Sequence, residues 1–163
     1  MFERFGEMDT IEEINTLANN LKKENDYDSI VELAKENGID EEEAEDFFGG
    51  AKPTLVDNPL MGALGKLTIE ERDLKINKED VINDWVGYIR AKCVESEALQ
   101  KAIRSKKKSL KGCLGALLKW GFAHQMDIDQ RIVEAAGIQA GKVTSGTPNM
   151  KTAKLLITEY YMG

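Results

Sequence analysis

Residues 101–124 read KAIRSKKKSLKGCLGALLKWGFAH, in which a lysine cluster leads directly into an apolar segment. The apolar residues recur every three or four positions, the period of one buried helix face. Ser105 or Ser109 can cap the start of this helix through a side-chain oxygen. We therefore expect a core helix whose inner face carries Leu110, Cys113, Leu114 and Leu117.

Four lysines crowd the expected start of this helix: Lys106, Lys107, Lys108 and Lys111. The helix dipole places partial positive charge at that end, so cations there are mildly unfavourable unless an anion compensates them. The segment is therefore either a solvated basic turn or a binding face, and the sequence leaves both interpretations open.

The bulk composition favours helices. The 163 residues are 42% hydrophobic and only 7% aromatic, with three prolines. Ala, Leu, Ile, Glu and Lys are good helix formers, and their abundance argues against a β-sandwich or barrel. We predict an all-α protein, a multi-helix bundle with one main core.

Charge is distributed unevenly along the chain. Residues 1–50 hold 16 acidic and 4 basic side chains, a net charge of −12. Residues 51–80 are close to neutral, whereas residues 81–163 hold 7 acidic and 13 basic side chains, a net charge of +6. This asymmetry favours self-association or a partner that presents both kinds of potential.

Capping residues and apolar periodicity together predict nine helices. Most of these starting points carry a residue that can cap a helix, and the Thr147-Pro148 pair is expected at N-cap and N1 of the last helix. The inner face of the eighth helix should carry Ile128, Ile132, Val133 and Ala136. The expected helices begin near Thr10, Ser29, Asp40, Asn58, Asn77, Ser96, Ser109, Asp127 and Thr147.

A break in periodicity at Gly49-Gly50-Ala51-Lys52-Pro53 coincides with the change in charge. Glycine and proline together mark a loop or linker. We expect an acidic N-terminal helical subdomain over residues 1–50 and a main helical domain over residues 51–163, unless the two form one continuous domain.

The stretch LAKENGIDEEEAEDFF has the outline of a helix-turn-helix. Carboxylates would stand at the end of the second helix that should approach DNA, so phosphate repulsion argues against DNA recognition. A small helical bundle or an acidic docking surface is the better interpretation. The candidate acidic face consists of Glu41, Glu42, Glu43, Glu45 and Asp46.

The sequence offers little for catalysis. His124 has no evident Asp or Ser partner, and Cys93, Cys113 and His124 lack the spacing of a zinc site. A P-loop is absent, because Gly146 is followed by Thr147-Pro148. We expect no enzyme activity, no cofactor and no metal.

Both cysteines fall on apolar helical positions, which predicts buried thiols in a reducing, intracellular environment. We also expect no membrane association, because the sequence contains no apolar run of signal-peptide or membrane length. Gly112-Cys113-Leu114-Gly115 matches the GXXG of KH modules, but small residues one turn apart more often let two helices approach closely.

Two short motifs carry a family resemblance. Lys108-Ser109-Leu110-Lys111-Gly112-Cys113 fits the pattern K-[ST]-L-x-G-[CA], and the terminal helix ends in Tyr160-Tyr161. With these motifs the chain resembles the PcfK-like family of phage and conjugative-element proteins over roughly residues 81–163. Some members of that family are anti-CRISPR proteins that inhibit the type II RNA-guided nuclease.

The resemblance implies a non-enzymatic anti-defence protein in the cytoplasm of a bacterial host, with a type II CRISPR nuclease as partner. The acidic face would imitate phosphates, and the basic face would contact an acidic patch or bound nucleic acid. The alternative is an accessory protein that binds nucleic acid directly. A homo-oligomer through an exposed Tyr160 or Tyr161 is a further hypothesis, although we expect at least one of the two to be buried in the core. The candidate basic face consists of Arg104, Lys106, Lys107, Lys108 and Lys111.

Overall fold

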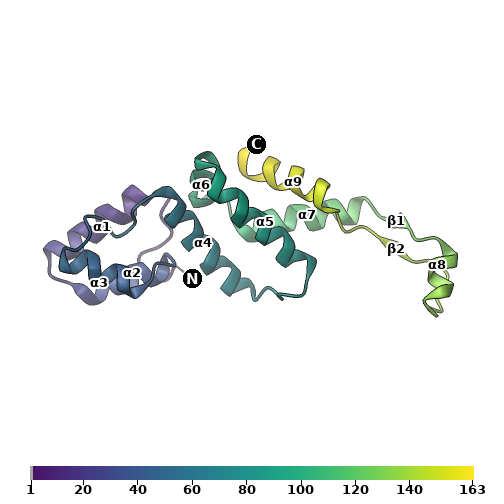
Figure 1. The fold of residues 1–163 in the computed structure, drawn as a ribbon, viewed down its shortest axis with the longest axis horizontal. Helices are drawn as coiled ribbons and strands as arrows, with labels where there is room; N and C mark the ends of the chain where they lie inside the picture. The colour runs from purple at the N-terminus through teal and green to yellow at the C-terminus, as the bar shows by residue number, and fades with distance from the viewer. Residues whose placement is uncertain (1) are drawn as a thin grey trace.

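The computed structural model describes residues 2–163 and confirms an all-α fold (Figure 1). A two-residue antiparallel pair, β1 (Met126–Asp127) with β2 (Thr144–Ser145), is the β structure of the described chain. Within those residues no helix is long and apolar enough to span a membrane. The helices are α1 (Ile11–Lys23), α2 (Tyr27–Glu36), α3 (Glu41–Gly49), α4 (Pro59–Leu74), α5 (Val81–Glu95), α6 (Glu97–Arg104), α7 (Leu110–Ala123), α8 (Gln130–Ala135) and α9 (Met150–Met162).

Most helix starts follow the expected capping chemistry. The Thr10 hydroxyl accepts a hydrogen bond from Glu13 N at 3.2 Å, and Asn58 Oδ1 accepts one from Met61 N at 2.9 Å. Ser109, rather than Ser105, caps α7 by accepting from Gly112 N at 3.0 Å. These side chains satisfy backbone N–H groups that have no partner inside the helix.

Several helix starts differ in position or in capping from the prediction, and α5 is capped by Asp80, three residues after Asn77. Asp26 caps α2, so this helix begins two residues before Ser29, and Asp40 precedes α3 without a side-chain capping bond. The prediction of Thr147-Pro148 as the opening of the last helix was wrong. Asn149 caps α9, accepting from Thr152 N at 3.0 Å, while Pro148 is buried just before it.

The buried apolar side chains form two clusters. The first lies among α1, α2 and α3 and extends to Leu55 and Val56, which follow the expected boundary at residue 50. The second lies among α4, α5, α6, α7 and α9 and contains Trp85, which is 5% exposed. We call the first unit the acidic lobe, residues 2–57, and the second the main lobe; Figure 1 shows them in succession along the long axis.

The two lobes meet at a contact between glycines. Gly38, at the end of α2, has a φ of +67°, and a Cβ built on it would lie 2.2 Å from Gly65 O in α4. A Cβ on Gly65 would in turn lie 2.2 Å from Asn37 O. The backbones therefore approach so closely that neither position has room for a side chain.

Residues 124–149 project from the main lobe at the end opposite the acidic lobe (Figure 1). This segment, called the arm here, contains β1, α8 and β2. The prediction of a packed helix from Asp127 was wrong, because Asp129 caps a helix of six residues. Of the expected inner face only Val133 is fully buried, whereas Ile132 is 63% exposed.

Both cysteines are buried, as predicted, and neither is in a disulfide. Burial raises the pKa of Cys93 to about 11 and that of Cys113 to about 12, because a thiolate is poorly solvated in the core. Both thiols therefore remain protonated and unreactive at neutral pH.

Because the backbones touch at the glycine contact between the lobes, adding one methyl group there should destabilise the fold strongly. Gly65→Ala should lower the free energy of unfolding by about 2 kcal/mol, because the new Cβ collides with backbone rather than with a side chain that can move. Urea unfolding followed by circular dichroism measures this change.

Gly115→Ala is the matched control, since a Cβ on this α7 residue meets nothing within 4 Å. Alanine favours helix over glycine, so the control should gain up to ~1 kcal/mol. Equal effects of the two substitutions would show that the lobes do not meet as described.

Candidate interaction surfaces

The acidic face lies on the outer side of α3. Ala44 and Phe47 point into the first core cluster, which leaves the residues between them on the surface. Glu43 is half-buried. The exposed members are Glu41, Glu42, Glu45 and Asp46.

Three of the five carboxylates have partners inside the lobe. Glu43 pairs with Lys52, Glu41 lies 3.4 Å from the Lys35 ammonium, and Glu45 accepts from the Tyr27 hydroxyl at 3.4 Å. Within residues 2–163, Glu42 and Asp46 form no ion pair. These two carboxylates are therefore available to a partner without breaking an existing contact.

The basic segment occupies the loop between α6 and α7 and the first turn of α7. The side chains of Lys106, Lys107 and Lys111 are exposed. Lys106 N donates to Asp9 Oδ1 at 2.6 Å, which ties the loop to the acidic lobe. Lys108 is half-buried: its ammonium lies 5.1 Å from the Tyr160 ring centroid and donates to Tyr160 O. Three lysines, not four, thus face solvent.

A buried lysine shapes this loop from beneath. Lys66 of α4 has no exposed surface, and its ammonium donates to Ser105 O at 2.8 Å and to Lys108 O at 2.9 Å. Glu7 supplies the counter-charge at 2.5 Å. Two loop carbonyls are thereby fixed toward the interior, and the side chains of Lys106 and Lys107 between them turn outward.

Arg104 does not belong to the basic face, and its assignment there is corrected. Its side chain is 2% exposed and spans the seam between the lobes. The guanidinium donates to Met8 O at 2.9 Å and to Asn37 Oδ1 at 2.8 Å. The pKa of Arg104 is lowered by burial, against the opposing effect of Glu7 and other carboxylates nearby. Arg104 therefore joins the lobes and is inaccessible to phosphates.

Glu70 completes the buried polar cluster. It lies one turn after Lys66 on α4, and its Oε2 accepts from Leu110 N at 2.9 Å, at the start of α7. Burial raises the pKa of Glu70, whereas the hydrogen bond from Leu110 N and the nearby Lys66 lower it in part. Neighbouring residues of α4 thus fix both the lysine loop and the helix after it.

The two motifs behind the family resemblance form one packed unit. Ser109 N donates to the Tyr160 hydroxyl at 3.0 Å, and a Cβ on Gly112 would lie 2.2 Å from that oxygen. Tyr161 is 3% exposed, which agrees with the expectation that at least one of the two tyrosines is buried, whereas Tyr160 is half-buried. The absence of a side chain at Gly112 lets α9 approach α7, so helix packing explains the first glycine of the GXXG pattern.

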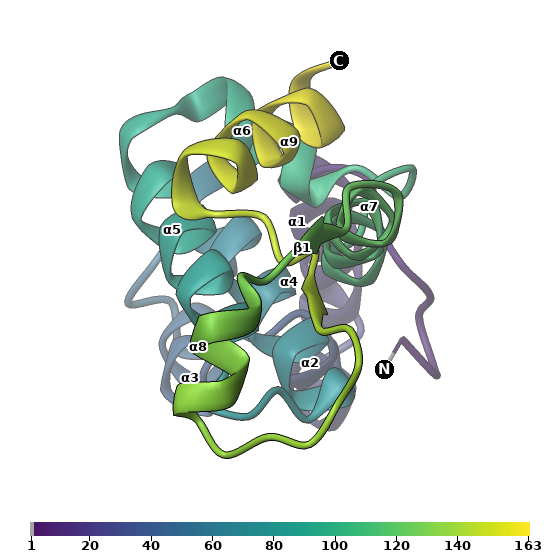
Figure 2. The same cartoon turned by 90° about the vertical axis from the view of Figure 1, so that its right-hand side faces the viewer.

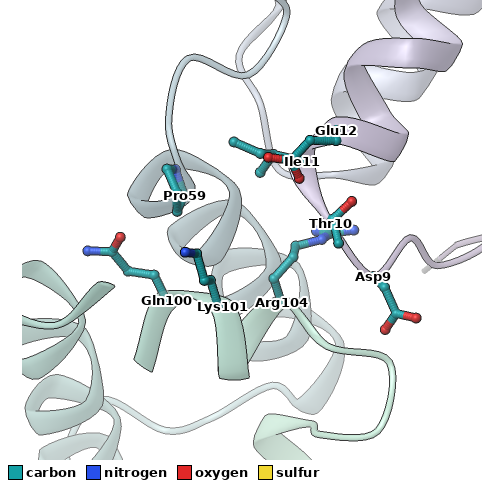
Figure 3. A pocket seen from close by; sticks show the side chains of 8 residues that line it. All are labelled: Asp9, Thr10, Ile11, Glu12, Pro59, Gln100, Lys101 and Arg104. Carbon is teal, nitrogen blue, oxygen red and sulfur yellow. The ribbon is translucent and has the colours of Figure 1, made fainter. Parts of the chain in front are cut away.

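A cavity of about 180 Å³ lies at the seam between the lobes (Figure 3). It is lined by residues from the start of α1, from Pro59 and from α6. Of the lining cations, Lys101 lies 2.7 Å from Glu97, and Arg104 donates from Nε to Met8 O and from Nη2 to Asn37 Oδ1, while its Nη1 has no hydrogen-bond partner among the described residues. Acidic Asp9 and Glu12 at its edge disfavour an anion.

His124 lies at the end of α7, where its ring stacks on Trp120 with centroids 4.1 Å apart. Its Nδ1 is 2.8 Å from Trp120 O. Within residues 2–163 no group of three or more His, Cys, Asp or Glu side chains is arranged to hold a metal ion.

Three charged residues of the buried polar cluster were not predicted from the sequence: Lys66, Glu70 and Glu7. One signal was available: Ala63, Lys66, Leu67 and Glu70 follow the helical period of a buried face, so two charged residues stand where apolar ones are expected. Buried charges require partners. The partners of Lys66 lie about 40 residues or more away in sequence, and no pattern in the sequence identifies them.

Comparisons with protein-family models, curated proteins and solved structures found no match for this chain. The resemblance to the PcfK-like family therefore rests on Lys108–Cys113 and Tyr160–Tyr161 alone.

The buried ammonium of Lys66 makes a stability prediction. Lys66→Met should lower the free energy of unfolding by about 3 kcal/mol, because Glu7 and two loop carbonyls lose their partner. Lys78→Met, at an exposed position, should change it by less than about 0.5 kcal/mol. Urea unfolding measures both, and a loss below about 1 kcal/mol for Lys66→Met would contradict the assigned role.

Proposed function

We propose that this chain is a non-enzymatic anti-defence protein of a phage or mobile element that binds and inhibits a type II CRISPR RNA-guided nuclease. The observation that carries the proposal is the exposed acidic face on α3, in which Glu42 and Asp46 have no basic partner within residues 2–163. The resemblance of the Lys108–Cys113 motif and the tyrosine pair to PcfK-like proteins supports it.

The physical basis is competition for a basic surface. Nucleases that hold nucleic acid present lysine and arginine side chains to phosphates. Carboxylates on one short helix offer a set of negative charges at fixed positions, and α3 carries them on a lobe with its own core. Binding of this face would occupy the channel that the nucleic acid needs.

The test adds the purified full chain to a panel of guide-loaded type II nucleases and measures target cleavage and co-elution. The proposal predicts a complex and loss of cleavage for at least one nuclease. Glu42→Lys combined with Asp46→Lys should weaken inhibition at least ~10-fold, equivalent to about 1.4 kcal/mol.

Asp73→Lys with Glu79→Lys is the matched control, because both residues are exposed and lie in the main lobe. Each pair of substitutions raises the net charge by four units, so a general charge effect would weaken both variants equally. Equal loss would overturn the assignment to α3, and absence of inhibition across the panel would overturn the function.

The alternative function is direct binding of nucleic acid through the outward-facing Lys106, Lys107 and Lys111. Three phosphate contacts predict that the logarithm of the affinity for duplex DNA falls with the logarithm of salt concentration with a slope of about −3. Lys107→Glu with Lys111→Glu should abolish binding, whereas Lys78→Glu should not. Fluorescence anisotropy of labelled duplex DNA at low salt measures this binding. Absence of binding at low salt would rule out the alternative function.

A further inference from the structure

The arm and the adjoining end of α7 carry apolar side chains that the rest of the described chain leaves exposed. Large hydrophobic residues follow one another from the second half of α7 to the loop after α8, each at least half exposed. They are Leu118 (61%), Phe122 (75%), Met126 (68%), Ile132 (63%) and Ile138 (50%). Single exposed apolar residues are ordinary, but such a series marks an interaction surface.

The arm also lacks a hydrophobic core of its own that would stabilise it. Its strands have two residues each and α8 has six. Within it only Val133 and Pro148 are buried. A two-stranded hairpin by itself is marginal in water, so contacts with another surface would stabilise this segment.

An apolar cavity of about 200 Å³ opens at the base of the arm. Its lining includes Trp85, Leu117, Leu118 and Phe122, together with Gly146 and Pro148 from the segment that follows β2. Gly121 and Gly146 approach so closely that a Cβ on Gly121 would lie 2.4 Å from Gly146 O. The cavity is therefore a fixed feature of the place where the arm joins α7.

The charges of the arm favour a second copy as the occupant. A two-fold contact sets the same surface patch of both copies against each other, so a patch with little net charge avoids repulsion between the copies. Residues 124–149 hold three acidic and two basic side chains. Four of these form ion pairs within the arm: Lys142 lies 3.0 Å from Asp127, and Arg131 lies 2.6 Å from Asp129.

The shape of the molecule supports the same occupant. The acidic lobe lies at the end opposite the arm, so two copies joined through their arms keep their acidic lobes apart (Figure 1). Figure 2, which views the molecule from the arm end, shows β1 and α8 nearest the viewer, with α7 seen nearly end-on to their right. Joining through the acidic lobes would instead bring like charges together.

We propose that the chain forms a two-fold dimer in which the two arms lie antiparallel. The tip of each arm then lies against the base of the other. Ile132 and Ile138 of one copy cover Leu118, Phe122 and the cavity of the second copy, and the reciprocal contact closes the interface. The surfaces around α3 and the lysine loop remain exposed, so the dimer presents two copies of each.

The experiment measures the mass of the full chain in solution by light scattering after size exclusion and by sedimentation equilibrium. The wild-type chain should have twice the 18.2 kDa mass of one chain. Phe122→Asp and Ile132→Asp, tested separately, should each give a monomer, because each would place two like charges in an apolar interface. Circular dichroism establishes that both variants are folded, as expected for positions that are 75% and 63% exposed.

Val94→Asp on α5 is the matched control, since Val94 is 61% exposed and lies outside the arm. This variant should remain a dimer. A monomeric wild-type chain at micromolar concentration would overturn the proposal, as would a dimer that persists in the folded Phe122→Asp and Ile132→Asp variants. Neither outcome depends on whether the chain inhibits a nuclease.

Discussion

Two buried cations, Lys66 and Arg104, hold the parts of this molecule together. An ammonium or guanidinium inside a protein loses its hydration and has to recover that energy from specific partners. Lys66 finds them in Glu7 and the carbonyls of Ser105 and Lys108, and Arg104 in Met8 and Asn37. These partners come from both lobes, so satisfying the two charges fixes the lysine loop, the N-terminal segment and the seam together.

The surface charges follow from this internal arrangement. Because the loop carbonyls point inward to Lys66, three lysines of the loop and of α7 point outward, while Lys108 packs on Tyr160. The acidic face has a different origin, since α3 buries Ala44 and Phe47 and leaves its carboxylates in solvent. The helix α3, which carries the acidic face, and the arm lie at opposite ends of an elongated molecule (Figure 1).

Capping residues and helical periodicity predicted most of the helices but few of the contacts between them. Thr10, Asn58, Ser96 and Ser109 cap helices as their side chains predict. The arm was missed because Ile128, Ile132 and Val133 follow a helical period that local rules read as a packed face. Arg104 was misplaced for a related reason: its neighbours are exposed lysines, and only long-range contacts reveal that its guanidinium is buried.

The sequence by itself determined the all-α class, the caps at Thr10, Asn58, Ser96 and Ser109, the buried cysteines and the separation of acidic from basic segments. These features depend on backbone capping, helical periodicity and composition, which act over a few residues. The tertiary structure decided which charges are inside, which lysines face solvent and which apolar residues remain uncovered. Those outcomes depend on contacts such as Lys66 with Glu7 and Gly38 with Gly65, between residues far apart in sequence, where the desolvation of charge and the close approach of backbones are fixed only by the complete fold.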